Sequence, residues 1–177
     1  MGSWATNAKT KTERCKEIEN DCNWESETSK SQLLGKRVTT SGLWTLQKIT
    51  DKDNDKVEYI LTIHMMNKHQ GQWWVKSIYT GCGPCYYDCP KSLVKQWLKL
   101  KDNQFENEYE TNWYHTWKAY DEKWEQAQSL KTGDVITCGN EKVKFLHWYT
   151  KNHNKLVGAR EIDGKMFWYY TYGITSF

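Results

Sequence analysis

The chain has 177 residues, and its 25 lysine and arginine residues exceed its 22 aspartate and glutamate residues by a net charge of +3. No apolar run approaches the roughly 20 residues that cross a bilayer, and the N-terminus is polar, so we expect neither a membrane span nor a secretory signal. Six cysteines without such a signal then predict a cytoplasmic protein, with thiols kept reduced.

Aromatic residues make up 15% of the chain and include eleven tryptophans. Because the mean hydropathy is low, at −0.90, rings must supply much of the buried apolar surface. Rings that remain at the surface are typical of contacts with other macromolecules. From residue 131 onward, seven basic and four acidic side chains give this end of the chain a charge of +3. A modestly basic C-terminal face is compatible with nucleic-acid binding.

The N-terminal part is expected to form a helix followed by a sheet. Residues 12–21 have helical periodicity, with Thr12 as the cap. Residues 36–50, 57–66 and 72–79 have strand character, and their short connections imply an antiparallel meander covered by helices. The first of these strands contains a serine–glycine pair that indicates a bulge or turn.

Alternating acids between the first two predicted strands raise the question of a calcium site. Asp51, Asp53 and Asp55 are spaced as in an EF-hand loop. The glycine and the distal glutamate of such a loop are missing, and strands rather than helices flank the run. We therefore expect a solvated hairpin turn here.

A proline- and cysteine-rich junction at residues 81–90 separates the sheet from a helix predicted at residues 90–101. Pro90 suits the first position of a helix, which would leave Asp88 or Cys89 at the cap. We expect a structural or functional node here, made of Pro84, Tyr86, Tyr87, Asp88, Cys89 and Pro90.

The cysteines of this junction allow three interpretations. Cys82 and Cys85 have the spacing of a thioredoxin-type redox pair, but no second proline follows Pro90 to face it. Zinc held by both of these cysteines and Cys89 would need a fourth ligand from elsewhere. Reduced thiols packed among aromatic rings are the interpretation we favour, so neither a metal nor a cofactor is expected.

Residues 113–128 give the clearest helical pattern, with a stripe of large rings that is typical of a packing face. Four short strands then follow between residues 131 and 177, joined by turn formers such as Asp163-Gly164. They predict a small SH3-like or partly open β-barrel. The fold class is therefore α+β, with a first domain at residues 1–130 and a β-barrel subdomain at residues 131–177.

Alternation along the predicted barrel strands assigns their side chains to faces. It puts Phe145, His147 and Tyr149 on one face and Lys144, Leu146 and Trp148 on the other. The last strand, residues 166–172, is aromatic on both faces, and a barrel can bury only one of them.

Several motifs in chain order resemble a family of small uncharacterised proteins carried by plasmids, phages and integrative elements of bacteria. They are the Met-Gly-Ser-Trp start, the block Gly83-Pro84-x-Tyr86-Tyr87-Asp88-Cys89-Pro90, the tryptophan-rich helix and the Gly133-Asp134 barrel entry. The similarity spans most of the chain, and the block is its specific part. Cys82, Cys85 and an extra serine before Trp4 depart from the family pattern, which argues against Cys82 and Cys85 as a shared site.

The resemblance implies an accessory protein of mobile DNA. Our leading hypothesis is a counter-defence protein, specifically an anti-CRISPR, that binds a host nucleoprotein effector such as an RNA-guided nuclease, with double-stranded DNA as a second partner. We expect no enzymatic activity, no membrane partner and no small-molecule substrate. Lysines would contact phosphates and exposed rings would stack or anchor the partner. The residues expected to do so are Trp74, Lys76, Lys142, Lys144, Trp148, Lys151, Lys155 and Arg160.

Three alternatives remain at this point. The first is a cysteine-dependent enzyme with Cys89 as nucleophile and Asp88, His115 or His147 as its partner. The second is a plasmid or phage DNA-binding maintenance protein. The third is structural: Trp148 and its neighbours pack against the helices, and the lysines only solvate the surface.

Overall fold

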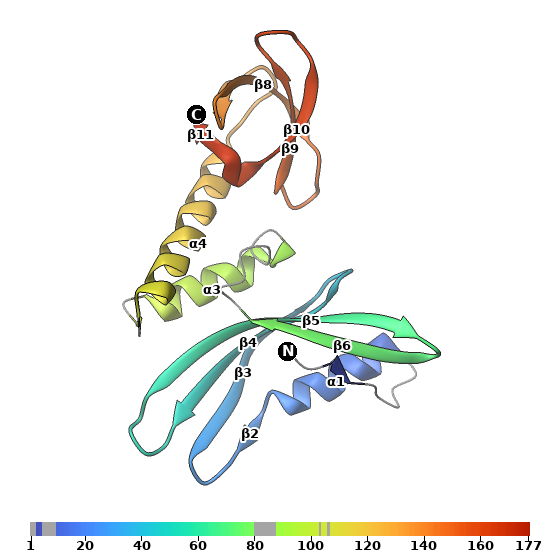
Figure 1. Cartoon of the computed structure of the whole chain (residues 1–177), viewed down its shortest axis with the longest axis vertical. Coiled ribbons are helices and arrows are strands. Elements are labelled where there is room, and N and C mark those ends of the chain that lie inside the picture. Colours follow the sequence, from blue (N-terminus) through green and yellow to red (C-terminus); the bar gives the residue numbers. More distant parts are fainter. Residues whose placement is uncertain (1–2, 5–9, 80–87, 103, 106) are drawn as a thin grey trace. The chain divides into compact units, whose positions relative to one another are not determined.

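The computed structural model describes the chain except residues 1–2, 5–9, 80–87, 103 and 106. The described residues form three helices and two antiparallel sheets, so the predicted α+β class is confirmed (Figure 1). The chain divides into two compact units, Met1–Thr111 and Asn112–Phe177. This boundary precedes the one expected at residue 130, because most of the last helix groups with the C-terminal sheet. The domain assignment, in the sense of independently folding pieces, stays a prediction.

Sheet A, in the first unit, is six-stranded with the order β1-β6-β5-β4-β3-β2. Its core is the predicted meander, from β3 to β6. The strand predicted at residues 36–50 is instead two strands, because the Thr39 N–H donates to the Gly42 carbonyl (2.8 Å) and closes a turn. The strands are β1 Ser3–Trp4, β2 Trp24–Glu25, β3 Ser29–Val38, β4 Gly42–Asp51, β5 Val57–His69 and β6 Gln72–Tyr79.

Helix α1 (Lys11–Asp21) begins at a capping box. The Glu13 N–H donates to the Thr10 hydroxyl (3.1 Å), and the Thr10 N–H donates to the Glu13 carboxylate (2.9 Å). The cap is therefore Thr10, and the prediction of Thr12 was wrong. Both threonines stand before the first buried residues of the helix. Only Thr10 is followed three residues later by a glutamate, which completes the reciprocal pair of hydrogen bonds.

One face of sheet A packs on α1, and α3 (Lys91–Lys101) lies over the opposite face (Figure 1). The Trp97 indole N–H donates to the Tyr59 carbonyl (3.1 Å) and ties α3 to β5. Pro90 is the N-cap of α3, not its first residue as predicted, and its carbonyl accepts from the Leu93 N–H (2.9 Å). The α1 face forms one buried cluster of Cys15, Ile18, Cys22, Leu43, Met66 and Val75.

The second unit contains sheet B, five-stranded with the order β10-β9-β8-β7-β11. After β10, a 3₁₀ turn η1 (Thr171–Gly173) brings β11 back to pair with β7, which curls the sheet into the predicted partly open barrel. Helix α4 (Glu108–Ala127) starts earlier than expected, and Trp117 and Ala127 of its ring-rich stripe are fully buried. The strands are β7 Val135–Cys138, β8 Glu141–Trp148, β9 Lys155–Arg160, β10 Met166–Tyr170 and β11 Ile174–Ser176.

The interior of sheet B is an apolar cluster of Ala127, Ile136, Cys138, Val143, Phe145, Leu156 and Ile174. A β-bulge between Phe145 and His147 shifts the register of β8 against β9. Trp148 therefore lies on the same side as Phe145, with ring centroids 5.2 Å apart, and not on the side of Lys144 as alternation predicted. No helix among the described residues is long and apolar enough to cross a membrane.

Candidate functional site

The strand pairing of sheet B defines a face turned away from its core. Leu156 is fully buried, so its neighbours Lys155 and Val157 point outward, and they pair with Tyr170 and Trp168 on β10. We call this the outer face of sheet B. On β8, β9 and β10 it consists of Lys142, Lys144, His147, Lys155, Val157, Ala159, Met166, Trp168 and Tyr170.

A lysine held by two rings marks the centre of the outer face. The Lys155 ammonium lies 4.6 Å from the ring centroid of Trp168 and 4.8 Å from that of Tyr170. The two rings meet edge to face, with centroids 5.2 Å apart. Both cation–π contacts are attractive and restrict the lysine to one orientation. Trp168 is nevertheless 51% exposed, so it keeps ring surface for a partner.

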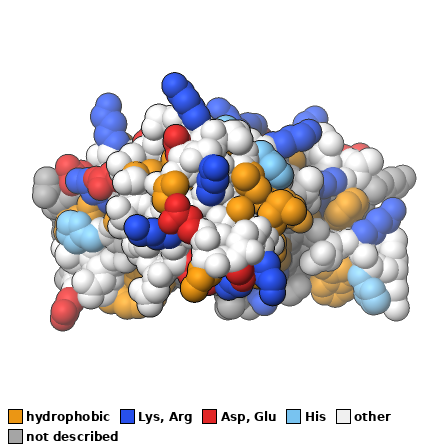
Figure 2. Space-filling model, turned by 90° about the horizontal axis from the view of Figure 1, so that it is seen from above, with side chains coloured by type: hydrophobic (Ala, Val, Ile, Leu, Met, Phe, Trp, Pro, Cys, Tyr) orange, Lys and Arg blue, Asp and Glu red, His pale blue; other side chains and the backbone are white. Residues whose placement is uncertain are grey.

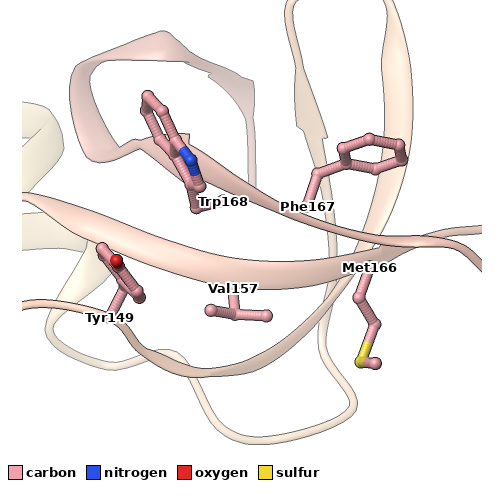
Figure 3. Close-up of a pocket in the computed structure, with 5 residues that line it drawn as sticks. All are labelled: Tyr149, Val157, Met166, Phe167 and Trp168. Atoms are coloured by element: carbon pink, nitrogen blue, oxygen red, sulfur yellow. The ribbon is translucent and has the colours of Figure 1, made fainter.

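Beside this lysine, an open hollow of about 490 Å³ is lined by Tyr149, Val157, Met166, Phe167 and Trp168. Figure 3 shows Trp168 and Phe167 on β10, Val157 on the neighbouring strand, and Tyr149 on the segment that follows β8. Tyr149 is 60% exposed and Met166 68% exposed. Exposed apolar residues that gather on one face are typical of contact surfaces.

The outward positions of the strands of sheet B carry three lysines, Lys142, Lys144 and Lys155, and no carboxylate. Lys151 is exposed in the loop that joins β8 to β9. In the view of Figure 2, hydrophobic, basic and acidic side chains all reach the surface of the molecule. The outer face therefore combines aromatic rings with charged side chains that are all lysines.

Arg160, a predicted partner-binding residue, is half-buried and pairs with the inward-facing Val143, so it does not belong to the outer face. It forms ion pairs with Glu141 (3.0 Å) and with Asp163, and its guanidinium lies 4.6 Å from the Phe167 ring centroid. Hydrogen bonds to Asp163 and then Glu141 raise the pKa of Arg160 above its ordinary value. Its contacts fix the hairpin of β9 and β10.

Trp148, a second predicted partner-binding residue, packs on the core of sheet B. Its ring stacks on His153 with centroids 4.3 Å apart and planes 3° apart. The His153 ring nitrogen Nδ1 is in turn hydrogen-bonded to the Gln128 side-chain oxygen (2.6 Å). These contacts orient the β8–β9 loop, which carries Lys151.

The remaining predicted partner-binding residues lie in the first unit. Trp74 and Lys76 alternate with the buried Val75 on β6, so they point to the face of sheet A opposite α1. Trp74 is half-buried and Lys76 exposed. Of the eight predicted residues, the outer face of sheet B therefore holds Lys142, Lys144 and Lys155.

The predicted node around Cys89 lies only partly within the described residues, because Pro84, Tyr86 and Tyr87 fall outside them. Cys82 and Cys85 fall outside as well, so the redox and zinc predictions stay predictions. Asp88 is exposed and Pro90 half-buried.

Cys89 itself is buried, and its thiol donates to the Pro90 carbonyl (3.8 Å). The histidines suggested as its partners, His115 and His147, are both exposed and belong to the second unit. Within the part of the chain that the structure describes, no three His, Cys, Asp or Glu side chains gather to hold a metal ion.

A buried polar row crosses sheet A beneath α1. His64 hydrogen-bonds through Nε2 to the Thr45 hydroxyl (2.9 Å) and through Nδ1 to the Ser77 hydroxyl (2.8 Å). Burial, and then the charge of Arg14, lower the pKa of His64 to about 4, so the ring is neutral at pH 7. Either tautomer is satisfied, because each hydroxyl can donate or accept. The row thus satisfies the polar groups of a buried histidine by hydrogen bonds within sheet A.

The sequence prediction did not include the large side chains on and beside the outer face, namely Trp168, Tyr170, Tyr149 and Met166. A signal for them existed, because the last strand is aromatic on both faces and only one can be buried. What was missing is the pairing that tells the two faces apart. Leu156 on β9 identifies the inner one.

No protein-family model, curated protein or solved structure matches this chain. Among the surfaces described above, the outer face of sheet B is the one that combines exposed rings with three lysines.

Proposed function

We propose that this protein is a binding protein that engages a host nucleoprotein effector, an RNA-guided defence nuclease, through the outer face of sheet B. The observation that carries the proposal is the Lys155 ammonium held between the rings of Trp168 and Tyr170 on an exposed sheet face. The resemblance to mobile-element proteins supplies the biological setting. The surface supplies the mode of action, which is contact with another macromolecule.

The energetics of such a face support this mode. An exposed tryptophan with a fixed neighbour loses little side-chain entropy when a partner covers it, and tryptophan is among the residues that dominate binding energies. Lys155 is already oriented by its two rings, so its ordering costs little on binding. A nucleoprotein offers phosphates for the lysines and flat surfaces for the rings.

The test is inhibition of DNA cleavage by a panel of purified, guide-loaded nucleases. The double variant Trp168→Ala/Lys155→Ala should weaken inhibition at least about tenfold, because it removes the ring and the cation at the centre of the face. The matched control is Trp24→Ala/Lys16→Ala, which removes an exposed tryptophan and an exposed lysine from the first unit. It should inhibit like the unmodified protein.

If the unmodified protein neither binds nor inhibits any nuclease of the panel, the proposed function is wrong. If the double variant inhibits fully, the effector is contacted elsewhere. Cys89→Ser separates the enzymatic alternative: a folded Cys89→Ser protein that has lost all inhibition would favour a cysteine-dependent enzyme.

A further inference from the structure

The outer face of sheet B also indicates which part of a nucleoprotein it fits. Its cations, Lys142, Lys144 and Lys155, are all lysines, whereas the one arginine near it is engaged by two carboxylates. Lysine is depleted at the centres of protein–protein interfaces, and it binds phosphate as a point charge. With no carboxylate at the outward strand positions, the face is complementary to a polyanion.

The exposed rings distinguish one class of nucleic acid from another. A duplex buries the faces of its bases and offers a sheet surface only phosphates and groove edges. Met166 and Trp168 would then lie against charged backbone, with no apolar surface to cover them. In a single strand the bases are free to stack on aromatic side chains, which is how other sheet surfaces bind them.

The rows of the sheet place the two kinds of contact side by side. Lys144, Ala159 and Met166 form one row across β8, β9 and β10, and His147, Val157 and Trp168 form the next. Adjacent strands are about 4.8 Å apart, so Lys144 on β8 and the ring-bearing strand β10, two strands away, are separated by roughly 10 Å. Ala159 and Val157, which lie between them on β9, have short side chains, and Val157 lines the hollow beside Trp168.

We propose that the hollow lined by Tyr149, Val157 and Trp168 accepts a base of single-stranded nucleic acid, whose phosphates lie against Lys144 and Lys155. This inference deepens the proposed function and rests on the same face. It names the exposed single strand of a nuclease complex, guide RNA or displaced DNA, as the contacted component.

Fluorescence anisotropy of labelled oligonucleotides tests the inference with the full chain alone. We expect a 12-nucleotide single strand to bind at least about tenfold more tightly than a duplex of the same length at low salt. The difference is the stacking of one base on an aromatic ring, which the duplex cannot make. Trp168→Ala should weaken single-strand binding by roughly 5- to 150-fold, and Trp168→Phe should retain most of it. Trp24→Ala is the matched control and should bind normally.

Salt dependence isolates the phosphate contacts. Lys144→Ala should reduce the slope of log affinity against log salt by about 0.7, the value for one phosphate contact on a single strand. Lys16→Ala, on the exposed side of α1, should leave the slope unchanged. Circular dichroism of each variant verifies that the protein is folded.

Two results would overturn the inference and are distinguishable from failure of the proposed function. Equal binding of duplex and single strand would put a duplex on the face. Binding of neither, by a protein that still inhibits the nuclease, would put a protein surface there. Tight single-strand binding without any inhibition would instead retain the inference and reject the proposed function.

Discussion

The two sheets of this protein use the same antiparallel architecture but treat their second face in opposite ways. Sheet A is covered on one face by α1 and on the other by α3, and Trp44 at its centre is 1% exposed. Sheet B buries one face in its own curl and leaves Trp168, on the other, 51% exposed. A strand that carries a tryptophan is therefore a packing element or a contact element according to what covers its second face.

The same contrast holds for the polar groups. In sheet A, His64 is buried and satisfied by two hydroxyls, so its polarity serves the interior. In sheet B, Lys155 is held by rings at the surface, so its charge remains available to a ligand.

Gly158→Ala should have the largest effect on stability. A Cβ at this position would lie 2.1 Å from the Val143 side chain, which is fully buried, and 3.2 Å from the Lys144 carbonyl. Overpacking of this kind typically costs about 1–3 kcal/mol, and with a contact this close we expect a loss of about 3 kcal/mol in the free energy of unfolding. Urea unfolding followed by tryptophan fluorescence measures the loss.

Gly173→Ala is the matched control, because a Cβ there meets no atom within 4 Å. It should change the unfolding free energy by less than about 0.5 kcal/mol. If the two variants were equally stable, the close approach of β8 and β9 would not limit the packing of sheet B.

Acidification should destabilise the first unit through His64. The unfolded chain binds a proton below the ordinary pKa of 6.5, whereas the folded chain does so only below about 4. The contribution of neutral His64 to the free energy of unfolding is therefore fully present above pH 6.5 and decreases as the pH falls towards 4. Between pH 7 and pH 5 this loss is about 2 kcal/mol. His64→Asn should flatten this dependence, measured as unfolding free energy against pH.

Two carboxylates act in a lower range and do not obscure that window. Hydrogen bonding to Lys52 lowers the pKa of Glu25, and hydrogen bonding to Arg160 lowers that of Asp163. Their contributions are lost below their ordinary values of 4.5 and 3.8. A His64→Asn protein with an unchanged slope between pH 7 and pH 5 would contradict the assignment.

Trp168→Ala should destabilise the protein less than Gly158→Ala or acidification does, although it removes the largest side chain of the outer face. We expect a change of about 0.5 kcal/mol, typical of surface substitutions, since its ring is half exposed and its neighbours stay paired by the backbone. We expect Trp168→Ala to weaken binding of a single strand much more than it lowers the stability of the fold. Thermal unfolding and anisotropy on the same sample compare the two, and a strongly destabilised variant would make Trp168 a packing residue.

Local signals in the sequence were sufficient for the fold class and for most elements. Residues 72–79 are a strand with the predicted bounds, and the turn at Asp163-Gly164 joins two strands as its dipeptide indicates. Turn residues and alternation act over a few positions, so they can be recognised without knowledge of the rest of the chain.

What the sequence could not supply is the pairing between distant segments. The bulge in β8 reversed the expected side of Trp148, and the ion pairs with Glu141 and Asp163 removed Arg160 from the candidate site. The cap of α1 moved to Thr10 because only that residue completes a reciprocal pair. Each depends on a partner that a periodic pattern does not identify.

The extra residue in β8, Leu146, affects the curvature of the sheet separately from the side on which each residue lies. Without it, Phe145, His147 and Trp148 would pair with Gly158, Val157 and Leu156 in an unbroken ladder, each on its present side. The bend that a bulge imparts would be lost. A one-residue deletion would thus preserve the inside and outside of the sheet while flattening it, so curvature can be altered independently of sidedness.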